Sequence, residues 1–200
     1  MRIFAERAHR YENRLKYPIV SLFMENRDKH IRNFLRSGSG ALLDLGAGTG
    51  YYLNGFAKNF SSINAIDSSK EMLNIFKNNN RGKKFIAIKS DALKFSASKK
   101  FDRILCIGLL NYLGKTDAAH LVRKIYSLLK NGGKVLLSAP DEQKVSGRAY
   151  KQIWKARGVK INLYSKKFLL EKMRAAGFRN IHVRNEKDFT TFHIILEAGK

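Results

Sequence analysis

The sequence predicts an α/β fold with a doubly wound, mostly parallel sheet of seven strands in one domain. Strand patterns alternate with helix patterns through most of the chain, which is typical of a parallel sheet with both faces covered. The last two strand patterns have no helix between them, so we expect a terminal antiparallel hairpin. A length of 200 residues suits one domain with a sizeable core.

Short apolar runs mark the expected strands, at 41–45, 63–66, 85–88, 101–107, 134–138, 179–184 and 189–197. Helical patterns occupy 2–36, 51–60, 68–79, 116–130, 143–157 and 165–176. Pro18 divides the first of these into two helices, and Ser68 can cap the third, with Glu71 as its capping-box partner. The glycines of Asn131-Gly132-Gly133 and Gly177 are expected to end the helices that precede them.

The composition excludes several classes of protein. The sequence contains no run of about 18 apolar residues, which is the length needed to span a membrane. The charged N-terminus lacks the apolar core of a secretory signal. Cys106 is the single cysteine, so neither an internal disulfide nor a cysteine-based zinc site is expected. The five histidines also lack metal-ligand spacing. A cytoplasmic location follows as the default.

The charge balance is strongly basic. Lys and Arg number 39 against 16 Asp and Glu, for a formal net charge of +23. Such a field favours anionic partners, which include nucleic acid, anionic lipid, an acidic carrier protein and phosphorylated small molecules. A solvated basic surface without a partner explains the same charge, so composition leaves both interpretations open.

A glycine-rich turn follows the first expected strand, in Asp44-Leu45-Gly46-Ala47-Gly48-Thr49-Gly50. Glycines there let the backbone turn tightly and approach a ligand closely. The dinucleotide pattern G-x-G-x-x-G would require a third glycine at position 51, where this chain has Tyr51. Asp44 ends the strand just before the glycines, and its carboxylate suits a cationic ligand better than a pyrophosphate.

Two further aspartates end the next two strands. Asp67 follows the second strand, 17 residues past Gly50, where a carboxylate can accept hydrogen bonds from ribose hydroxyls. Asp91 follows the third strand, where an adenine amino group could be recognised. Ligands bind at the carboxyl ends of strands in open α/β sheets. Helix capping and turn formation are the alternative roles for these side chains.

These motifs as a set resemble the class I S-adenosylmethionine-dependent methyltransferase family, in its small-molecule branch. The resemblance runs in order over about residues 40–197 and includes Leu42–Gly50, Ala65–Leu73, Phe101–Leu113, Leu128–Leu137 and the late segment from Tyr164 to Phe178. It implies a Rossmann-like fold, S-adenosylmethionine as cofactor with S-adenosylhomocysteine as product, and no metal.

The resemblance also implies roles for particular residues. Gly46, Gly48 and Gly50 would pass beneath the methionine part of the cofactor, and Asp67 would hold the ribose hydroxyls. Other members of the implied cofactor site would contact adenine or the methionine end, or flank those contacts: Asp44, Ala47, Ser68, Met72, Asp91, Ala92, Ile107 and Gly108.

The acceptor is less well defined than the cofactor. The segment Cys106–Leu110 lacks the proline motif of base N-methyltransferases, which favours a small-molecule acceptor that could be a lipid, quinone-like or anionic compound. An RNA methyltransferase that uses the basic surface is the alternative, and a non-catalytic cofactor-binding or NAD-binding module is a remote one. No catalytic base is identified. Tyr11 and Tyr17 are candidates to close over the cofactor, although the family often has Tyr-Asp where this chain has Tyr11-Glu12. The further substrate candidates are Asn111, Tyr112, Tyr150 and Trp154.

Residues 1–36 precede the first strand, carry several aromatic residues and are too few to hold a core of their own, so we expect them to form a helical cover over the active site. Residues 37–200 form the expected methyltransferase domain, in which the resemblance implies an acceptor-site or lid insertion at residues 141–163. In that insertion Lys144, Arg148, Lys151 and Lys155 share one helical stripe, with apolar residues on the other side. Either this is an ordinary surface helix with its apolar side inward, or it is a lid that meets an anionic acceptor or an anionic membrane.

Overall fold

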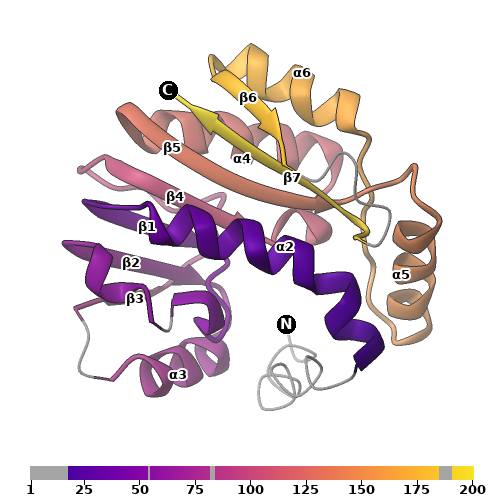
Figure 1. The fold of residues 1–200 in the computed structure, drawn as a ribbon, viewed down its shortest axis with the longest axis horizontal. Coiled ribbons are helices and arrows are strands. Elements are labelled where there is room, and N and C mark those ends of the chain that lie inside the picture. Colours follow the sequence, from indigo (N-terminus) through magenta and orange to yellow (C-terminus); the bar gives the residue numbers. More distant parts are fainter. Residues whose placement is uncertain (1–17, 54, 82–83, 185–190) are drawn as a thin grey trace.

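A seven-stranded sheet forms the centre of the molecule (Figure 1), in a computed structural model that describes residues 18–53, 55–81, 84–184 and 191–200. The strand order is β3-β2-β1-β4-β5-β7-β6, and only the pairs that involve β7 are antiparallel. The strands are β1 (Ala41–Leu45), β2 (Ser62–Asp67), β3 (Ile86–Lys89), β4 (Phe101–Ile107), β5 (Leu129–Pro140), β6 (Arg179–Val183) and β7 (His193–Gly199). The predicted fold class, with its terminal hairpin, is confirmed.

Helices cover both faces of this sheet (Figure 1). The described α-helices are α2 (Pro18–Arg36), α3 (Lys70–Asn79), α4 (Lys115–Leu128), α5 (Val145–Ala156) and α6 (Lys166–Ala176). Short 3-10 helices are η2 (Tyr51–Leu53), η3 (Ala57–Asn59) and η4 (Leu110–Tyr112). None of the helices in this part of the chain has the length and apolar character needed to cross a membrane.

Alternating residues of the central strands enter two separate cores. Leu42 faces the core that contains Phe34 and Leu35 of α2, whereas its neighbour Leu43 faces the core beneath α4 and α6. Both leucines are fully buried. A strand with two covered faces must be apolar at consecutive positions, which explains the continuous apolar run at 41–45.

Two of the expected helix boundaries were wrong. Residues 51–60 do not form one α-helix but the separate turns η2 and η3, because Gly55 adopts φ +92° between them and interrupts helical backbone. Ser69 rather than Ser68 caps α3, since its hydroxyl accepts a hydrogen bond from the Met72 amide at 3.2 Å. Ser69 also donates to the Glu71 carboxylate at 2.8 Å.

The boundary between α4 and β5 also differs from the expectation. The helix ends at Leu128, before Asn131-Gly132-Gly133, and β5 begins at once with Leu129 in an extended conformation. The two glycines lie inside β5, where the Gly132 amide donates to the Lys200 carbonyl and the Gly133 carbonyl accepts from the Lys200 amide. The glycines therefore pair with the end of the chain instead of capping the helix.

The second half of the expected N-terminal cover is α2, which packs on the sheet through Ile31, Phe34 and Leu35. Arg27, only 4% exposed, donates to the Tyr52 hydroxyl, and that hydroxyl donates to Asp28 at 2.7 Å. These bonds connect α2 to η2, the turn that follows the glycine loop. Residues 1–17, with Tyr11 and Tyr17, lie outside the described residues, so the covering role of 1–36 stays a prediction.

Helix α5 is rotated relative to the amphipathic pattern. Gly147 is its one buried residue, and Tyr150 and Trp154 lie half-buried on the same side. Val145 and Ile153, which would point inward in an ordinary surface helix, are 73% and 52% exposed. Contact at Gly147 decides this rotation, because a Cβ there would lie 2.0 Å from the Asp141 carbonyl oxygen.

We therefore expect Gly147→Ala to destabilise the protein, although alanine is the better helix former by about 1 kcal/mol. The methyl group would push α5 away from Asp141, at a cost of about 1–3 kcal/mol for an overpacked site. Urea unfolding of the two proteins measures the difference. Gln152→Ala, at an exposed position of the same helix, serves as the control and should change stability by less than about 0.5 kcal/mol. A Gly147→Ala variant more stable than the parent would contradict this close contact.

Candidate functional site

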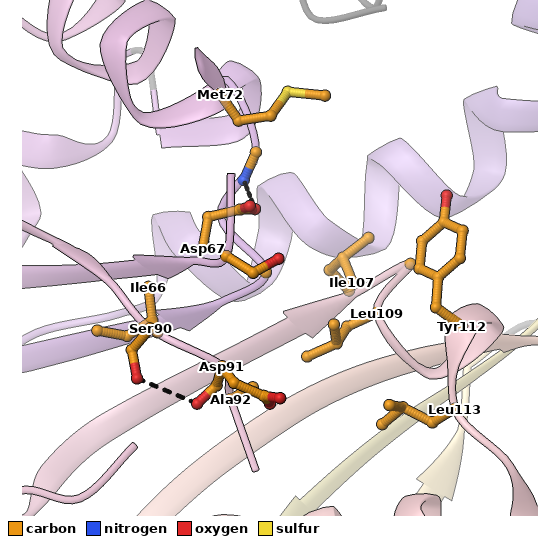
Figure 2. A pocket seen from close by; sticks show the side chains of 14 residues that line it. Ile66, Asp67, Met72, Ser90, Asp91, Ala92, Ile107, Leu109, Tyr112 and Leu113 are labelled. Carbon is orange, nitrogen blue, oxygen red and sulfur yellow. Dashed lines mark hydrogen bonds between the residues drawn. The ribbon is translucent and has the colours of Figure 1, made fainter. Parts of the chain in front are cut away.

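A pocket of about 280 Å³ opens at the carboxyl ends of the parallel strands β1, β2, β3 and β4 (Figure 2). The turns that follow these four strands supply its walls. The lining residues are Gly46, Gly48, Ile66, Asp67, Ser68, Met72, Ser90, Asp91, Ala92, Ile107, Gly108, Leu109, Tyr112 and Leu113. This edge of an open α/β sheet is the usual ligand site.

Hydrogen bonds to the end of β2 fix the glycine loop. The amides of Gly46 and Ala47 both donate to the Ile66 carbonyl, at 2.8 and 3.0 Å. The Gly48 amide donates to Asp67 Oδ2 at 2.9 Å. At Gly48 the backbone has φ +55°, a conformation that favours glycine. A Cβ built there would have no heavy atom within 4 Å, so this glycine leaves open space on the pocket side.

Gly50 belongs to the same motif, but its lack of a side chain serves packing within the protein. A Cβ at Gly50 would lie 2.5 Å from the Phe76 ring, so the third glycine admits close packing between the loop and α3. Ala47 packs against the core on the α2 side. Neither Gly50 nor Ala47 lines the pocket, whereas Gly46 and Gly48 do.

Asp67 is held by the backbone around it. Its Oδ2 atom accepts from Gly48, and its Oδ1 atom accepts from the Ser69 amide at 2.9 Å. Burial raises the pKa of Asp67, while hydrogen bonds from the Ser69, Gly48 and Ser68 amides act in the opposite direction. Each carboxylate oxygen keeps further lone-pair capacity. Figure 2 shows this carboxylate beside the cavity, below Met72.

Asp44 lies deeper, at the end of β1, and is only 5% exposed. Burial, and secondly the negative charge of Asp67, raise its pKa to about 7. A carboxyl group with this pKa changes its charge near neutral pH, so its state depends on the charge of whatever occupies the pocket. Cys106, on the adjacent strand β4, has its pKa raised to about 12 by burial, which makes its thiol a poor nucleophile.

The third aspartate of the predicted site lies at the other end of the pocket. Asp91 accepts a hydrogen bond from the Leu93 amide at 2.8 Å, which shapes the turn after β3. Its side chain is exposed and lines the cavity together with Ser90 and Ala92. The predicted turn-forming role and a place in the site are therefore both realised at Asp91.

The remaining wall of the pocket, which includes η4, depends on a tyrosine far along the chain. Tyr164 is fully buried, and its hydroxyl donates to the carbonyls of Leu110 and Leu113. Its amide donates to the Pro140 carbonyl at 2.9 Å, which anchors the residue to the end of β5. Burial raises the pKa of Tyr164 to about 12, so this hydroxyl stays protonated as a donor at neutral pH.

Next to η4 lies a second cluster, rich in aromatic side chains. The Asn111 amide group donates to the Tyr150 hydroxyl at 3.4 Å. Tyr150 stacks on Phe192 with 4.4 Å between ring centroids and meets Trp154 edge-on at 5.9 Å. His193 lies against Phe192 at 4.1 Å. The cluster joins three elements: η4, α5 and the start of β7.

The structure thus gathers most of the sequence-predicted residues into two adjoining places. The cavity holds nine of the twelve cofactor residues together with Tyr112; Asp44, Ala47 and Gly50 lie behind it. Asn111, Tyr150 and Trp154 lie in the aromatic cluster. Sequence reasoning missed Phe192 and His193, because an aromatic residue at the start of a strand is most often simple core. In the part of the chain that the structure describes, no His, Cys, Asp and Glu side chains form a group that could hold a metal ion.

Comparison with known proteins identifies the family. A family model described as a methyltransferase domain matches residues 11–183. A relative from Nautilia profundicola, carboxy-S-adenosyl-L-methionine synthase, is 28% identical over 191 residues, which covers 82% of this chain and 81% of that protein.

Solved structures share the fold at low sequence identity. Magnesium protoporphyrin IX methyltransferase from Synechocystis PCC 6803, with bound S-adenosylhomocysteine, has a TM-score of 0.71 and 14% identity, over 92% of this chain and 88% of that one. An S-adenosylmethionine-dependent methyltransferase from Thermotoga maritima has a TM-score of 0.72 and 17% identity, over 100% and 98% of the two chains.

The family match covers most of the chain, and it includes the glycine loop and the acidic strand ends that form the pocket. The chain therefore belongs to the class I S-adenosylmethionine-dependent methyltransferases.

Proposed function

We propose that this enzyme transfers the methyl group of S-adenosylmethionine, held in the pocket at the ends of β1 to β4, to a small-molecule acceptor that enters beside η4 and α5. The observation that carries the proposal is the cavity itself, in which open backbone at two glycines faces two aspartates. An RNA acceptor is the alternative, suggested by the net charge of +23 rather than by the shape of the site.

The residues present fit this cofactor. Gly48 and Gly108 both have open space where a Cβ would stand, so a ligand can lie directly against their backbone. Asp67 has lone pairs left, which we propose for the ribose hydroxyls, and we propose that Asp91 accepts a hydrogen bond from the adenine amino group. Met72 and Ile107 offer apolar contact to the flat base and the chain beyond it.

The chain's part in the reaction is to bind, orient and exclude water. The bound cofactor supplies an electrophilic methyl group on a sulfonium centre. Fixing donor and acceptor in line can contribute about 7–11 kcal/mol to lowering the barrier. The Gly108 amide, at the pocket, donates to the Ser138 hydroxyl at 3.2 Å, which fixes the turn after β4. We assign no general base among the described lining residues.

The aromatic cluster supports a flat acceptor with a hydrogen-bond donor. Tyr150 is half-buried and stacks on the buried Phe192 with 26° between the planes, and we propose that the edge of Tyr150 borders the entrance for a conjugated or quinone-like ring. Asn111 is 3% exposed, and its Oδ1 atom has no hydrogen-bond partner among the described residues. After a small rearrangement, that oxygen could accept from an acceptor N–H or O–H group. Tyr11 and Tyr17 remain proposed covers, outside the described residues.

The name of the Nautilia relative raises a second candidate, formation of a carboxylated cofactor. Among the described residues that line the pocket there is no Lys, Arg or His that could pair with a carboxylate on the donor group. A sulfonium with a plain methyl group needs no such cation. Methyl transfer is therefore the activity that we propose.

A substitution that fills the open space at Gly48 tests whether the cofactor binds at the glycine loop. We expect Gly48→Ala to weaken cofactor binding by about 1–3 kcal/mol, because the new methyl group occupies ligand space; that is about 5- to 150-fold in Kd. Gly55→Ala is the matched control, since Gly55 also has a positive φ (+92°) and open surroundings but does not line the pocket. Calorimetry with S-adenosylhomocysteine measures both variants. If Gly48→Ala bound S-adenosylhomocysteine as tightly as the parent protein, the glycine loop would not be part of the cofactor site.

The raised pKa of Asp44 predicts pH-dependent binding. A cationic ligand is attracted to the ionised carboxylate, so affinity for S-adenosylmethionine should rise as pH increases through about 7 and then level off. Asp44→Asn should flatten this profile between pH values of about 6 and 8. Titration calorimetry across that range supplies the measurement. A parent profile that is already flat would show that Asp44 does not respond to the cofactor.

The same group affects the stability of the unliganded protein. Its folded-state pKa of about 7 lies above the ordinary 3.8, so its stabilising contribution is complete below a pH of about 4 and is lost as pH rises through about 7. Asp44→Asn should therefore raise Tm more at alkaline than at acidic pH. A uniform shift at every pH would instead indicate a packing effect.

The proposed reaction itself is tested with methyl-labelled S-adenosylmethionine and fractionated cell extract. We expect label in a low-molecular-weight, nuclease-resistant product, and we expect Asp67→Ala to lose about 1.5–3 kcal/mol of cofactor-binding free energy. Label in a nuclease-sensitive fraction would favour the RNA alternative. Mass spectrometry of the cofactor pool would show a carboxylated product if the second candidate were correct.

A further inference from the structure

Helix α5 exposes an apolar strip to solvent. Val145 and Ile153 are 73% and 52% exposed, and Ala149 and Ala156 are exposed on the same side of the helix. At about 100° per residue these four side chains fall within an arc of about 80° on the helix. The opposite side, through Gly147, faces Asp141 and is therefore fixed to the domain.

A basic strip borders the apolar one. Lys151 and Lys155 are exposed, and they lie within about 120° of the apolar arc, together with Arg148. The Arg148 guanidinium also donates to the Glu142 backbone carbonyl at 3.0 Å. This bond holds the positive charge of Arg148 near the start of the helix. The sequence has six basic residues between positions 144 and 160 and no acidic residue between 143 and 170. The positive charge of this surface is therefore not balanced within its own segment.

This amphipathic surface adjoins the pocket. Tyr150, on the inner side of α5, contacts Asn111 of η4, and the next residue of η4, Tyr112, lines the cavity and is 36% exposed. Figure 1 shows α5 at one end of the domain, near the N-terminal end of β7 and away from its arrowhead. A surface that receives α5 would therefore lie close to the proposed acceptor entrance.

We propose that α5 docks on an anionic lipid bilayer, with Val145 and Ile153 in the interfacial layer and Lys151 and Lys155 on the phosphate headgroups. A helix with an aliphatic strip beside a basic strip is suited to this position, because the membrane offers both apolar depth and negative charge. An RNA partner would use the charges alone, since exposed aliphatic side chains gain little from contact with phosphates. This proposal does not depend on which acceptor is methylated.

Vesicle binding of the full chain tests the proposal. The probes are vesicles of pure phosphatidylcholine and of phosphatidylcholine mixed with phosphatidylglycerol, read by sedimentation and by the fluorescence of Trp154, the single tryptophan. We expect binding and a fluorescence shift with the mixed vesicles alone. V145S/I153S and K151Q/K155Q should each reduce that binding about tenfold or more, by loss of apolar burial and of headgroup attraction respectively.

Matched controls lie away from α5. Ile86→Ser removes an aliphatic side chain that is 56% exposed on the edge strand β3, and K58Q/K77Q removes two exposed lysines. These variants should bind vesicles like the parent, and all variants should keep the parent's affinity for S-adenosylhomocysteine, which reports an intact fold. If V145S/I153S fails to fold, I153S alone should show the same direction of change.

Three outcomes would overturn the proposal: no binding to mixed vesicles, equal binding to both kinds, or an equal loss in the control variants. A loss with K151Q/K155Q that is absent with V145S/I153S would also overturn it, and would assign the basic strip to a purely electrostatic partner such as RNA. Failure of vesicle binding with normal methyl transfer would leave the proposed function standing.

Discussion

The end of β2 is the fixed point on which the site depends. The Ile66 carbonyl accepts two amides from the glycine loop, and the Asp67 carboxylate accepts one amide from that loop and one from the start of α3. Ile66 and Asp67 thus fix both the glycine loop after β1 and the turn that leads from β2 into α3. A buried carboxylate is costly unless backbone donors surround it. The backbone amides that offset the cost of burying the Asp67 carboxylate also orient its remaining lone pairs toward the cavity.

Three glycines of this chain are required for different structural reasons, although the sequence does not distinguish them. Gly48 leaves open space beside the pocket, Gly50 makes room for Phe76, and Gly147 lets α5 approach the backbone of Asp141. Gly50 and Gly147 are thus packing requirements within the protein, whereas Gly48 borders the pocket. Spacing alone cannot separate these cases, because each depends on which atoms of other elements come near the missing Cβ.

The surface that we propose for the acceptor is built from distant parts of the chain. Tyr164 reaches back to the Leu110 and Leu113 carbonyls, and β7 lies between β5 and β6, which brings Phe192 and His193 beside Tyr150. The cofactor side, in contrast, comes from consecutive strand–turn units. The first 113 residues therefore contribute the lining of the pocket, whereas the last third sets the shape of the adjoining surface.

The sequence by itself determined the alternation of strands and helices, the mostly parallel sheet and its terminal hairpin, because each strand and the turn that follows it are local in the chain. Residue type and spacing also predicted that Gly48 and Asp67 lie together at the strand ends, and both line the pocket. Only the tertiary structure decided that Ser69 caps α3, that Asn131–Gly133 belong to β5, and that α5 turns Val145 and Ile153 outward. In the last two cases a contact with another element, Lys200 against Gly132 and Asp141 against Gly147, outweighed the local pattern. Such contacts depend on where distant segments meet, which local periodicity does not encode.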